Sequence, residues 1–207
     1  MRALFTDIGG VLATNGWDTD TRHAAVAHFR LDAEDIDARH RLSFELFETG
    51  KQSWDDYLKM VVFHEPRSFS HEAFTAFVLE QSQVFPEMLA LVAALKQKFG
   101  LKVVAVSNEG RELTEHRIQK LKLDGVIDFF VSSCFVHLRK PDPDIFKMAL
   151  DLAQVRPEET VYLEDRQMFV EVAQGLGLRA IRHRSFEETR AALAALGLDA
   201  PLASGRR

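Results

Sequence analysis

The 207-residue sequence has a single cysteine, Cys134, and no long apolar run. One cysteine cannot form an internal disulfide, which is typical of proteins of a reducing compartment. No apolar run approaches the ~18–20 residues that a membrane-spanning helix needs. The apolar stretch before Asp7 is too short for the core of a signal peptide. We therefore expect a cytoplasmic protein with no membrane association.

Positive charge is scarce relative to negative charge. The chain has 26 Lys and Arg against 31 Asp and Glu, a net charge of -5, and no long basic run. This balance argues against nucleic acid or an anionic membrane as a partner. Apolar residues make up 46% of the chain and charged residues 28%, which excludes a disordered or fibrous protein. The length predicts one domain, or one domain with an insert.

Short apolar runs that stop at polar residues predict five buried strands. They cover residues 3–6, 103–106, 129–131, 161–163 and 180–181. Helical patterns lie between strands at 86–99 and 142–153 and after the last strand at 185–197, with Pro86 in a first turn and Asp142 and Ser185 as N-caps. This alternation predicts an α/β fold, a parallel sheet with helices on both faces. The tail, residues 200–207, is expected to fray.

Residues 15–85 contain helical periodicity and no strand pattern. The predicted helices cover residues 20–30, 33–47, 53–63 and 70–84, and the stretch holds 7 Lys and Arg against 13 Asp and Glu. The simplest interpretation of this acidic excess is a solvated helical surface. We therefore predict a helical bundle inserted as a cap after the first strand. The predicted domains are a core of 1–14 and 86–207 and a cap of 15–85.

Polar residues follow several of the predicted strands, where ligands bind in open α/β sheets. They are Asp7, Ser107-Asn108, Glu164-Asp165 and, in a loop, Lys140. Each alone also suits a turn, a helix cap or an exposed surface. Together they offer hard oxygen ligands for Mg²⁺ and a hydroxyl, an ammonium and backbone N–H groups for a phosphate. Phosphoryl transfer requires such groups, because its catalysis is mainly positioning and charge neutralisation.

The motifs around these residues resemble those of the haloacid dehalogenase-like (HAD) hydrolase superfamily. They read FTDIGGVL (residues 5–12), VSN (106–108), RKPDPDIF (139–146) and VYLED (161–165). Their order fits the family, and Ser107 lies 100 residues after Asp7, Lys140 a further 33 and Asp165 a further 25. The resemblance covers nearly the whole chain, with residues 15–85 in the place of a helical C1 cap.

The resemblance implies a role for each motif. Asp7 would be the nucleophile that forms an aspartyl-phosphate, and Lys140 would keep it ionised. The implied Mg²⁺ ligands are Asp7, the backbone carbonyl of Gly9, and Asp165, with Glu164 nearby or acting through water. The implied phosphoryl-binding residues are Ser107, Asn108 and Lys140. The expected activity is Mg²⁺-dependent phosphatase action on a small phosphoester, such as a sugar phosphate.

Three positions depart from the family pattern. Gly9 stands where the general acid/base Asp is usual, Glu164 replaces an Asp, and Phe169 replaces a frequent Asn. Loss of a general acid/base typically costs ~10²–10⁴-fold in rate. We therefore expect a good leaving group, such as an anomeric sugar phosphate, or a cap residue or water that substitutes. The DxGxV first motif resembles a branch that includes sugar-1-phosphate phosphatases.

Other interpretations remain open. A 2-haloacid dehalogenase also uses an aspartate nucleophile but needs no metal, so Glu164-Asp165 favour the phosphatase. A binding module with the same fold but weakened chemistry would explain Gly9 and Phe169, whereas a receiver domain fits the length poorly. Glu109 either binds substrate, replaces the missing acid or, as we favour, is an acid in the first turn of a helix. Cys134 is expected to be a small buried residue and Trp54 a residue of the helical bundle. Trp17 either lines the substrate entrance or, as we favour, packs to seat the cap, and the histidines show no metal-binding spacing.

Overall fold

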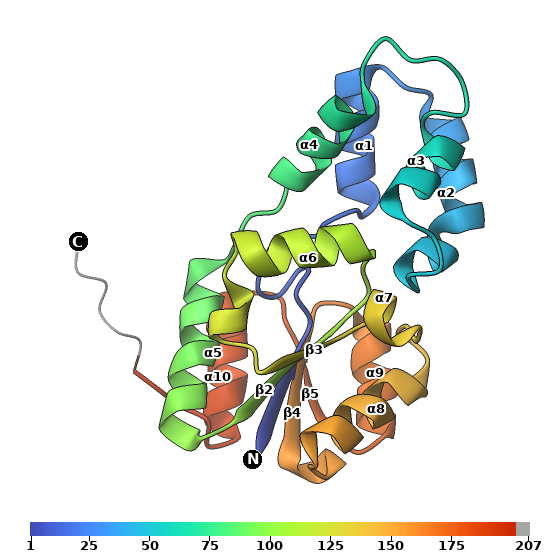
Figure 1. Cartoon of the computed structure of the whole chain (residues 1–207). Helices are drawn as coiled ribbons and strands as arrows, with labels where there is room; N and C mark the ends of the chain where they lie inside the picture. The colour runs from blue at the N-terminus through green and yellow to red at the C-terminus, as the bar shows by residue number, and fades with distance from the viewer. Residues whose placement is uncertain (202–207) are drawn as a thin grey trace, which may run out of the picture.

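The computed structural model describes residues 1–201, and a five-stranded sheet lies at its centre (Figure 1). The strands are β1 (Ala3–Thr6), β2 (Lys102–Ser107), β3 (Phe129–Ser132), β4 (Thr160–Glu164) and β5 (Arg179–Arg182). Every pairing is parallel, and the order is β3-β2-β1-β4-β5. β1, β2 and β4 are almost entirely buried, as expected for a parallel sheet covered on both faces. The predicted fold class is confirmed.

Helices cover both faces of the sheet because successive strand residues point to opposite sides. Leu4 packs in a cluster with residues of α5 (Pro86–Phe99) and α10 (Phe186–Ala195). Phe5 packs in a second cluster with residues of α8 (Pro143–Ala153) and α9 (Gln167–Gly175). Asp142 and Ser185 cap α8 and α10, as predicted. The two clusters fix the sheet between helix layers and so hold its carboxyl edge in place.

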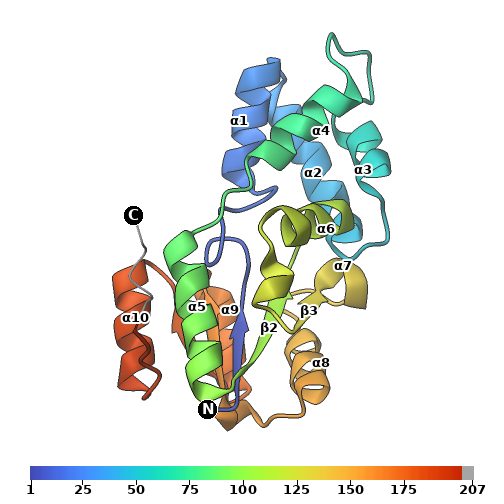
Figure 2. The ribbon, with the colours of Figure 1, turned by 60° about the vertical axis from the view of Figure 1, so that its left-hand side comes forward.

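Four helices lie between β1 and α5 in the chain and pack beyond the carboxyl ends of the strands (Figure 2). They are α1 (Thr19–Phe29), α2 (Ala33–Glu48), α3 (Trp54–Val61) and α4 (His71–Glu80). Their shared apolar cluster includes Trp54, as predicted, and Leu113 of α6 (Arg111–Lys120). The division of the chain at residues 14 and 85 into a core and a cap stays a prediction.

The helix predicted over 70–84 ends early, at Glu80, because the next residues pair with the other connection to the four helices. The backbone N–H of Thr14 donates to Gln83, and that of Phe85 donates to Leu12. Ala13 and Val84 form an antiparallel bridge. The two chain segments that leave and re-enter the sheet domain are thereby tied together.

The end of the described chain also differs from the prediction. Ala200, expected to fray, is 1% exposed and belongs to the core cluster of α5 and α10. The rest of the predicted frayed tail, from residue 202 on, lies outside the described residues. A four-residue helix, α7 (Ser133–Val136), was not predicted and contains the buried Cys134. Within residues 1–201, no helix combines the length and the apolar character required to cross a membrane.

Candidate active site

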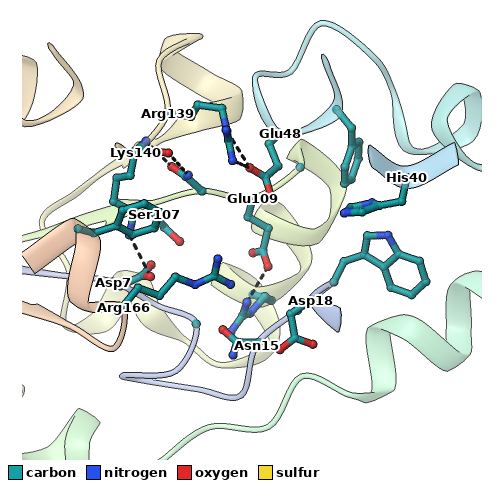
Figure 3. A pocket seen from close by; sticks show the side chains of 18 residues that line it. Asp7, Asn15, Asp18, His40, Glu48, Ser107, Glu109, Arg139, Lys140 and Arg166 are labelled. Atoms are coloured by element: carbon teal, nitrogen blue, oxygen red, sulfur yellow. Dashed lines mark hydrogen bonds and ion pairs between the residues drawn. The ribbon is translucent and has the colours of Figure 1, made fainter. Parts of the chain in front are cut away.

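The carboxyl edge of the sheet and the loop before α8 form the walls of one pocket (Figure 3). Strand register explains part of this, because Thr6 pairs with Leu163, so Asp7 and Glu164 leave adjacent strands at the same level. The predicted site residues that line the pocket are Asp7, Gly9, Ser107, Asn108 and Lys140. Carboxylate oxygens of Asp7, Glu164 and Asp165 lie within 4.8 Å of one another. The structure therefore brings all seven predicted residues to one place.

Lys140 is the central cation of this cluster. Its Nζ lies 2.9 Å from Asp7 Oδ2 and 2.7 Å from Glu164 Oε2, and it donates to the hydroxyl of Tyr162 at 3.1 Å. The lysine is fully buried. Burial alone would lower the pKa of Lys140, but Asp7 and Glu164 outweigh it and raise that pKa above its ordinary value. Lys140 is therefore held in its charged form.

Asp7 is oriented from both sides of its carboxyl group. Oδ1 accepts the backbone N–H of Ile8 at 2.7 Å, while Oδ2 faces Lys140. Burial raises the pKa of Asp7 above its ordinary value, and Lys140 and the Ser107 hydroxyl act in the opposite direction. Both oxygens of Asp7 are thus held in place at the pocket, and Oδ2 lies next to the Lys140 ammonium group.

A divalent cation fits the acidic side of this cluster. Asp7, Glu164 and Asp165 bring three carboxyl groups together, and the Lys140 ammonium group contacts two of them, Asp7 and Glu164. Asp165 Oδ1 is buried and has no hydrogen-bond partner among residues 1–201. Carboxylate oxygens are the ligands that Mg²⁺ prefers. The donor set and the unpartnered oxygen therefore suit Mg²⁺.

The structure separates the parts that Glu164 and Asp165 play. Glu164 is fully buried, its Oε2 contacts Lys140 and Tyr162, and its Oε1 accepts the backbone N–H of Arg166 at 3.0 Å. Both of its oxygens thus have protein partners. Asp165, by contrast, keeps an open oxygen. Glu164 thus contacts Lys140, whereas Asp165 has an oxygen without a partner in the described residues.

Asn108 holds the loop that carries Lys140. Its Nδ2 donates to the backbone carbonyl of Lys140 at 2.8 Å, and its Oδ1 accepts the backbone N–H of Lys140 at 2.8 Å. This pair of bonds joins the end of β2 to the loop before α8. The side chain of Asn108 therefore fixes Lys140, and its predicted contact with a phosphoryl group would come from its backbone N–H.

The pocket is also lined by residues that the sequence analysis did not assign to the site. They are Asn15, Asp18, His40, Glu48, Arg117, Arg139 and Arg166. Arg139 joins the two parts of the chain, because its Nη2 lies 2.7 Å from Glu48 of α2. Burial, together with the nearby Arg22, lowers the pKa of His40 to about 4, so its ring is neutral at pH 7. Arg139 directly precedes Lys140 and Arg166 directly follows Asp165, so these two residues had a sequence clue.

Glu109 corrects a prediction. It was expected in the first turn of a helix, but Gly110 is the N-cap of α6, so Glu109 lies before the helix. Its carboxylate is instead paired with Arg117, at 2.6 Å, inside the pocket. Trp17 lines the same pocket and also packs edge-on against Trp54, and its place at a substrate entrance stays a prediction. The three-residue gap between Ser107 and α6 turns Glu109 inward.

Asn15 occupies the space that a side chain at position 9 would need. A Cβ added to Gly9 would lie 2.6 Å from Asn15 Oδ1. Gly9 therefore leaves room for an amide from the segment that leads into α1. An amide does not titrate near neutral pH, so Asn15 can orient a leaving group but cannot supply its proton.

Gly10 gives a test of the cation site. Its φ is +70°, and an added Cβ would overlap the carboxylate of Asp165. We expect Gly10→Ala to weaken Mg²⁺ binding at least tenfold in calorimetric titration, and to cost about 1–2 kcal/mol of stability from the left-handed backbone. Gly125→Ala, whose Cβ would meet nothing within 4 Å, is the control. Equal Mg²⁺ affinity in both variants would contradict the site.

Comparisons with known proteins identify the family of this chain. The sequence profile of haloacid dehalogenase-like hydrolases matches residues 1–177. A phosphorylated carbohydrates phosphatase from Thermotoga maritima is 31% identical over 131 residues, which cover 63% of this chain and 56% of that protein. Bifunctional epoxide hydrolase 2 of Rattus norvegicus is 30% identical over 120 residues, covering 56% of this chain and 22% of that protein. The chain thus spans about a fifth to just over half of these relatives.

A solved structure shows the same fold. A HAD family enzyme from Bacteroides thetaiotaomicron, crystallised with magnesium and inorganic phosphate, superposes with a TM-score of 0.74 at 21% identity. The superposition covers 89% of this chain and 94% of that one. Because the profile match spans most of the sequence, this chain belongs to the haloacid dehalogenase-like hydrolase family.

Proposed function

We propose that this hydrolase is a Mg²⁺-dependent phosphatase that acts on a small phosphorylated metabolite, of the sugar phosphate class, through an aspartyl-phosphate. The observation that carries the proposal is the buried cluster of Asp7, Lys140 and Glu164 beside the unpartnered oxygen of Asp165. The phosphatase name of the Thermotoga relative, and the magnesium and phosphate of the Bacteroides structure, support it.

In this mechanism Asp7 attacks phosphorus, the bond from phosphorus to the alcohol oxygen breaks, and the phosphoryl group is transferred to the Asp7 carboxylate. The alcohol leaves with a proton taken from water, because Gly9 supplies no acid. Lys140 faces the same carboxylate and compensates negative charge at the transferred group. Ser107 and the backbone N–H of Asn108 would bind its oxygens. Water then cleaves the acyl phosphate, which releases inorganic phosphate and restores Asp7.

Asp7, Asp165 and the backbone carbonyl of Gly9 would hold the Mg²⁺, with Glu164 behind them. When bound, the ion supplies charge neutralisation for the phosphoryl oxygens. The protein's own contribution is to keep Asp7 and the phosphoryl group in line in a buried pocket. Glu164 serves that purpose by fixing Lys140.

The activity has a direct test. Phosphate release from a panel of sugar phosphates and p-nitrophenyl phosphate should require Mg²⁺ and stop when EDTA is added. The dehalogenase alternative makes the opposite prediction, since it needs no metal. Halide release from 2-chloropropionate that persists in EDTA, with no phosphate release from the panel, would overturn the phosphatase proposal.

The absence of an acid at position 9, where Gly9 stands, predicts which phosphoesters the enzyme hydrolyses well. We expect Gly9→Asp to supply a proton donor for poor leaving groups, and to raise kcat/KM for glycerol phosphate by up to about 10²-fold. Because Asn15 occupies that space, the substitution should be made with Asn15→Ala, and Asn15→Ala alone is the control. The gain should be smaller for p-nitrophenyl phosphate, whose leaving group needs no proton. No gain for glycerol phosphate would count against the missing-acid explanation.

A further inference from the structure

The carboxylate of Glu109 carries an oxygen that the protein itself does not use. Glu109 is 7% exposed, and its Oε1 lies 2.6 Å from Nη1 of Arg117. Its Oε2 is buried and has no hydrogen-bond partner anywhere in residues 1–201. A buried carboxylate oxygen without a donor is costly to retain. An unused acceptor of this kind therefore suggests that a bound molecule supplies the donor.

The surroundings hold Glu109 in one position. Arg117, 1% exposed, pairs with Oε1 and also donates from Nη2 to the backbone carbonyl of Thr14 at 2.5 Å. The backbone N–H of Glu109 donates to Ser133 at 3.0 Å. A Cβ on Gly16 would overlap Oε1, so only glycine allows this close approach. Arg117 and Gly16 thus confine Oε1 of the carboxylate, and Ser133 holds the backbone of Glu109.

Glu109 lies on the pocket wall that a leaving group would face. Asp7 and Glu109 line the same pocket, and Figure 3 shows the Arg166 side chain, which also lines it, between their carboxyl groups. A phosphoryl group attacked by Asp7 would lie beside that residue. The alcohol portion of the substrate would then extend into the rest of the pocket, which Glu109 also lines.

The ion pairs around the pocket favour a neutral hydrogen-bond donor, and not a cation, as the ligand group that contacts Glu109. Arg117 compensates Glu109, and Arg139 compensates Glu48 on the same wall. Asp18 accepts the backbone N–H of Thr21 and caps α1. A ligand ammonium would therefore meet carboxylates that are already partnered. A hydroxyl group needs only the open lone pair of Oε2.

We propose that Oε2 of Glu109 accepts a hydrogen bond from a hydroxyl group on the alcohol portion of the substrate. Glu109 thereby selects hydroxylated phosphoesters over esters of plain alcohols. This inference rests on the phosphatase activity proposed above. It assigns a specificity-determining residue to the pocket and names the feature of the substrate that this residue detects.

The test compares matched esters in the same protein. Glucose 1-phosphate is paired with cyclohexyl phosphate, and glycerol 1-phosphate with propyl phosphate, so that each pair differs chiefly in its hydroxyl groups. Wild type should prefer the hydroxylated member of at least one pair by tenfold or more in kcat/KM, as expected for a hydrogen bond to a charged acceptor. Because the readout is a ratio within one preparation, a reduced folded fraction cancels.

Glu109→Gln keeps an oxygen for Arg117 and places an amide N–H₂ where Oε2 was. It should reduce the preference about tenfold, and Glu109→Ala should reduce it at least as much. Gly16→Ala, which displaces the carboxylate, is an independent variant with the same expected result. The control is Glu115→Gln, an exposed glutamate of α6 beside Arg111, which should leave the ratio unchanged.

Three outcomes would overturn the inference. The first is a wild-type enzyme with no preference in either pair, and the second is an unchanged kcat/KM ratio in the Glu109 variants. The third is a loss of kcat/KM that the Glu109 variants show only toward phosphoethanolamine, which would indicate that Glu109 binds an ammonium group. Absence of Mg²⁺-dependent hydrolysis of p-nitrophenyl phosphate would instead contradict the phosphatase proposal itself. The two failures are thus distinguishable.

Discussion

Replacing Asp7 with asparagine is expected to reduce phosphatase kcat by at least 10³-fold, which corresponds to about 4 kcal/mol of transition-state stabilisation. The amide of asparagine is not a nucleophile toward phosphorus, so the covalent intermediate cannot form. Oδ1 of asparagine still accepts the backbone N–H of Ile8, and Lys140 keeps its bond to Glu164. The variant should therefore fold, and steady-state phosphate release measures the loss.

The matched control for Asp7→Asn is the same substitution at Asp55, an exposed residue of α3 that pairs with Lys59. It should retain wild-type activity. Acid-quenched wild-type enzyme should carry phosphate on Asp7 by mass spectrometry, whereas the Asp7→Asn variant should carry none. Substantial phosphate release by Asp7→Asn would contradict an aspartyl-phosphate route.

The fold was predictable because its strands are short apolar runs stopped by polar residues. Ala3–Thr6 was predicted to the residue, and the helix over Pro86–Phe99 was predicted with both of its ends. Pro86 and Gly100 mark those ends by local chemistry, since proline suits a first turn and Gly100 has a φ of +63°. Local signals of this kind do not depend on the rest of the chain.

Predictions were wrong where a distant segment decided the outcome. The helix expected to reach residue 84 ends at Glu80 because Gln83 and Phe85 pair with the chain near Thr14. Ala200 is buried because it packs into the cluster formed by α5 and α10. Neither contact leaves a pattern in the neighbouring sequence, so propensity and periodicity could not indicate it.

The candidate site also contains some residues that the sequence could predict and others that it could not. Asp7 directly follows an apolar strand, and Glu164 ends another. The rule that ligands bind at the carboxyl ends of strands therefore indicated both residues. Arg117 lies on the inner side of α6, nine residues after Asn108, and its pairing with Glu109 depends on where that helix begins. Glu48 reaches Arg139 from the end of α2. These contacts depend on how helices pack, which a single sequence does not state.

Replacing Lys140 with methionine is expected to affect both stability and activity. The substitution keeps much of the side-chain volume but removes the only ammonium within hydrogen-bonding distance of the Asp7 and Glu164 carboxylates in residues 1–201. Two buried carboxylates then face each other without compensation. Breaking a buried ion pair in this way costs about 3–5 kcal/mol. Chemical denaturation without Mg²⁺ should show this loss, and Mg²⁺ should restore part of it by supplying positive charge.

A second substitution separates the two effects of Lys140. Glu164→Gln in the Lys140→Met background removes one of the opposed charges while keeping an acceptor for the hydroxyl of Tyr162. The double variant should regain much of the lost stability, because only one buried carboxylate, Asp7, remains without its cation. It should not regain activity, because charge compensation at the transferred phosphoryl group is still missing. Additive stability losses would show that Lys140 and Glu164 do not act as a pair. Recovery of phosphate release together with stability would mean that Lys140 serves folding alone.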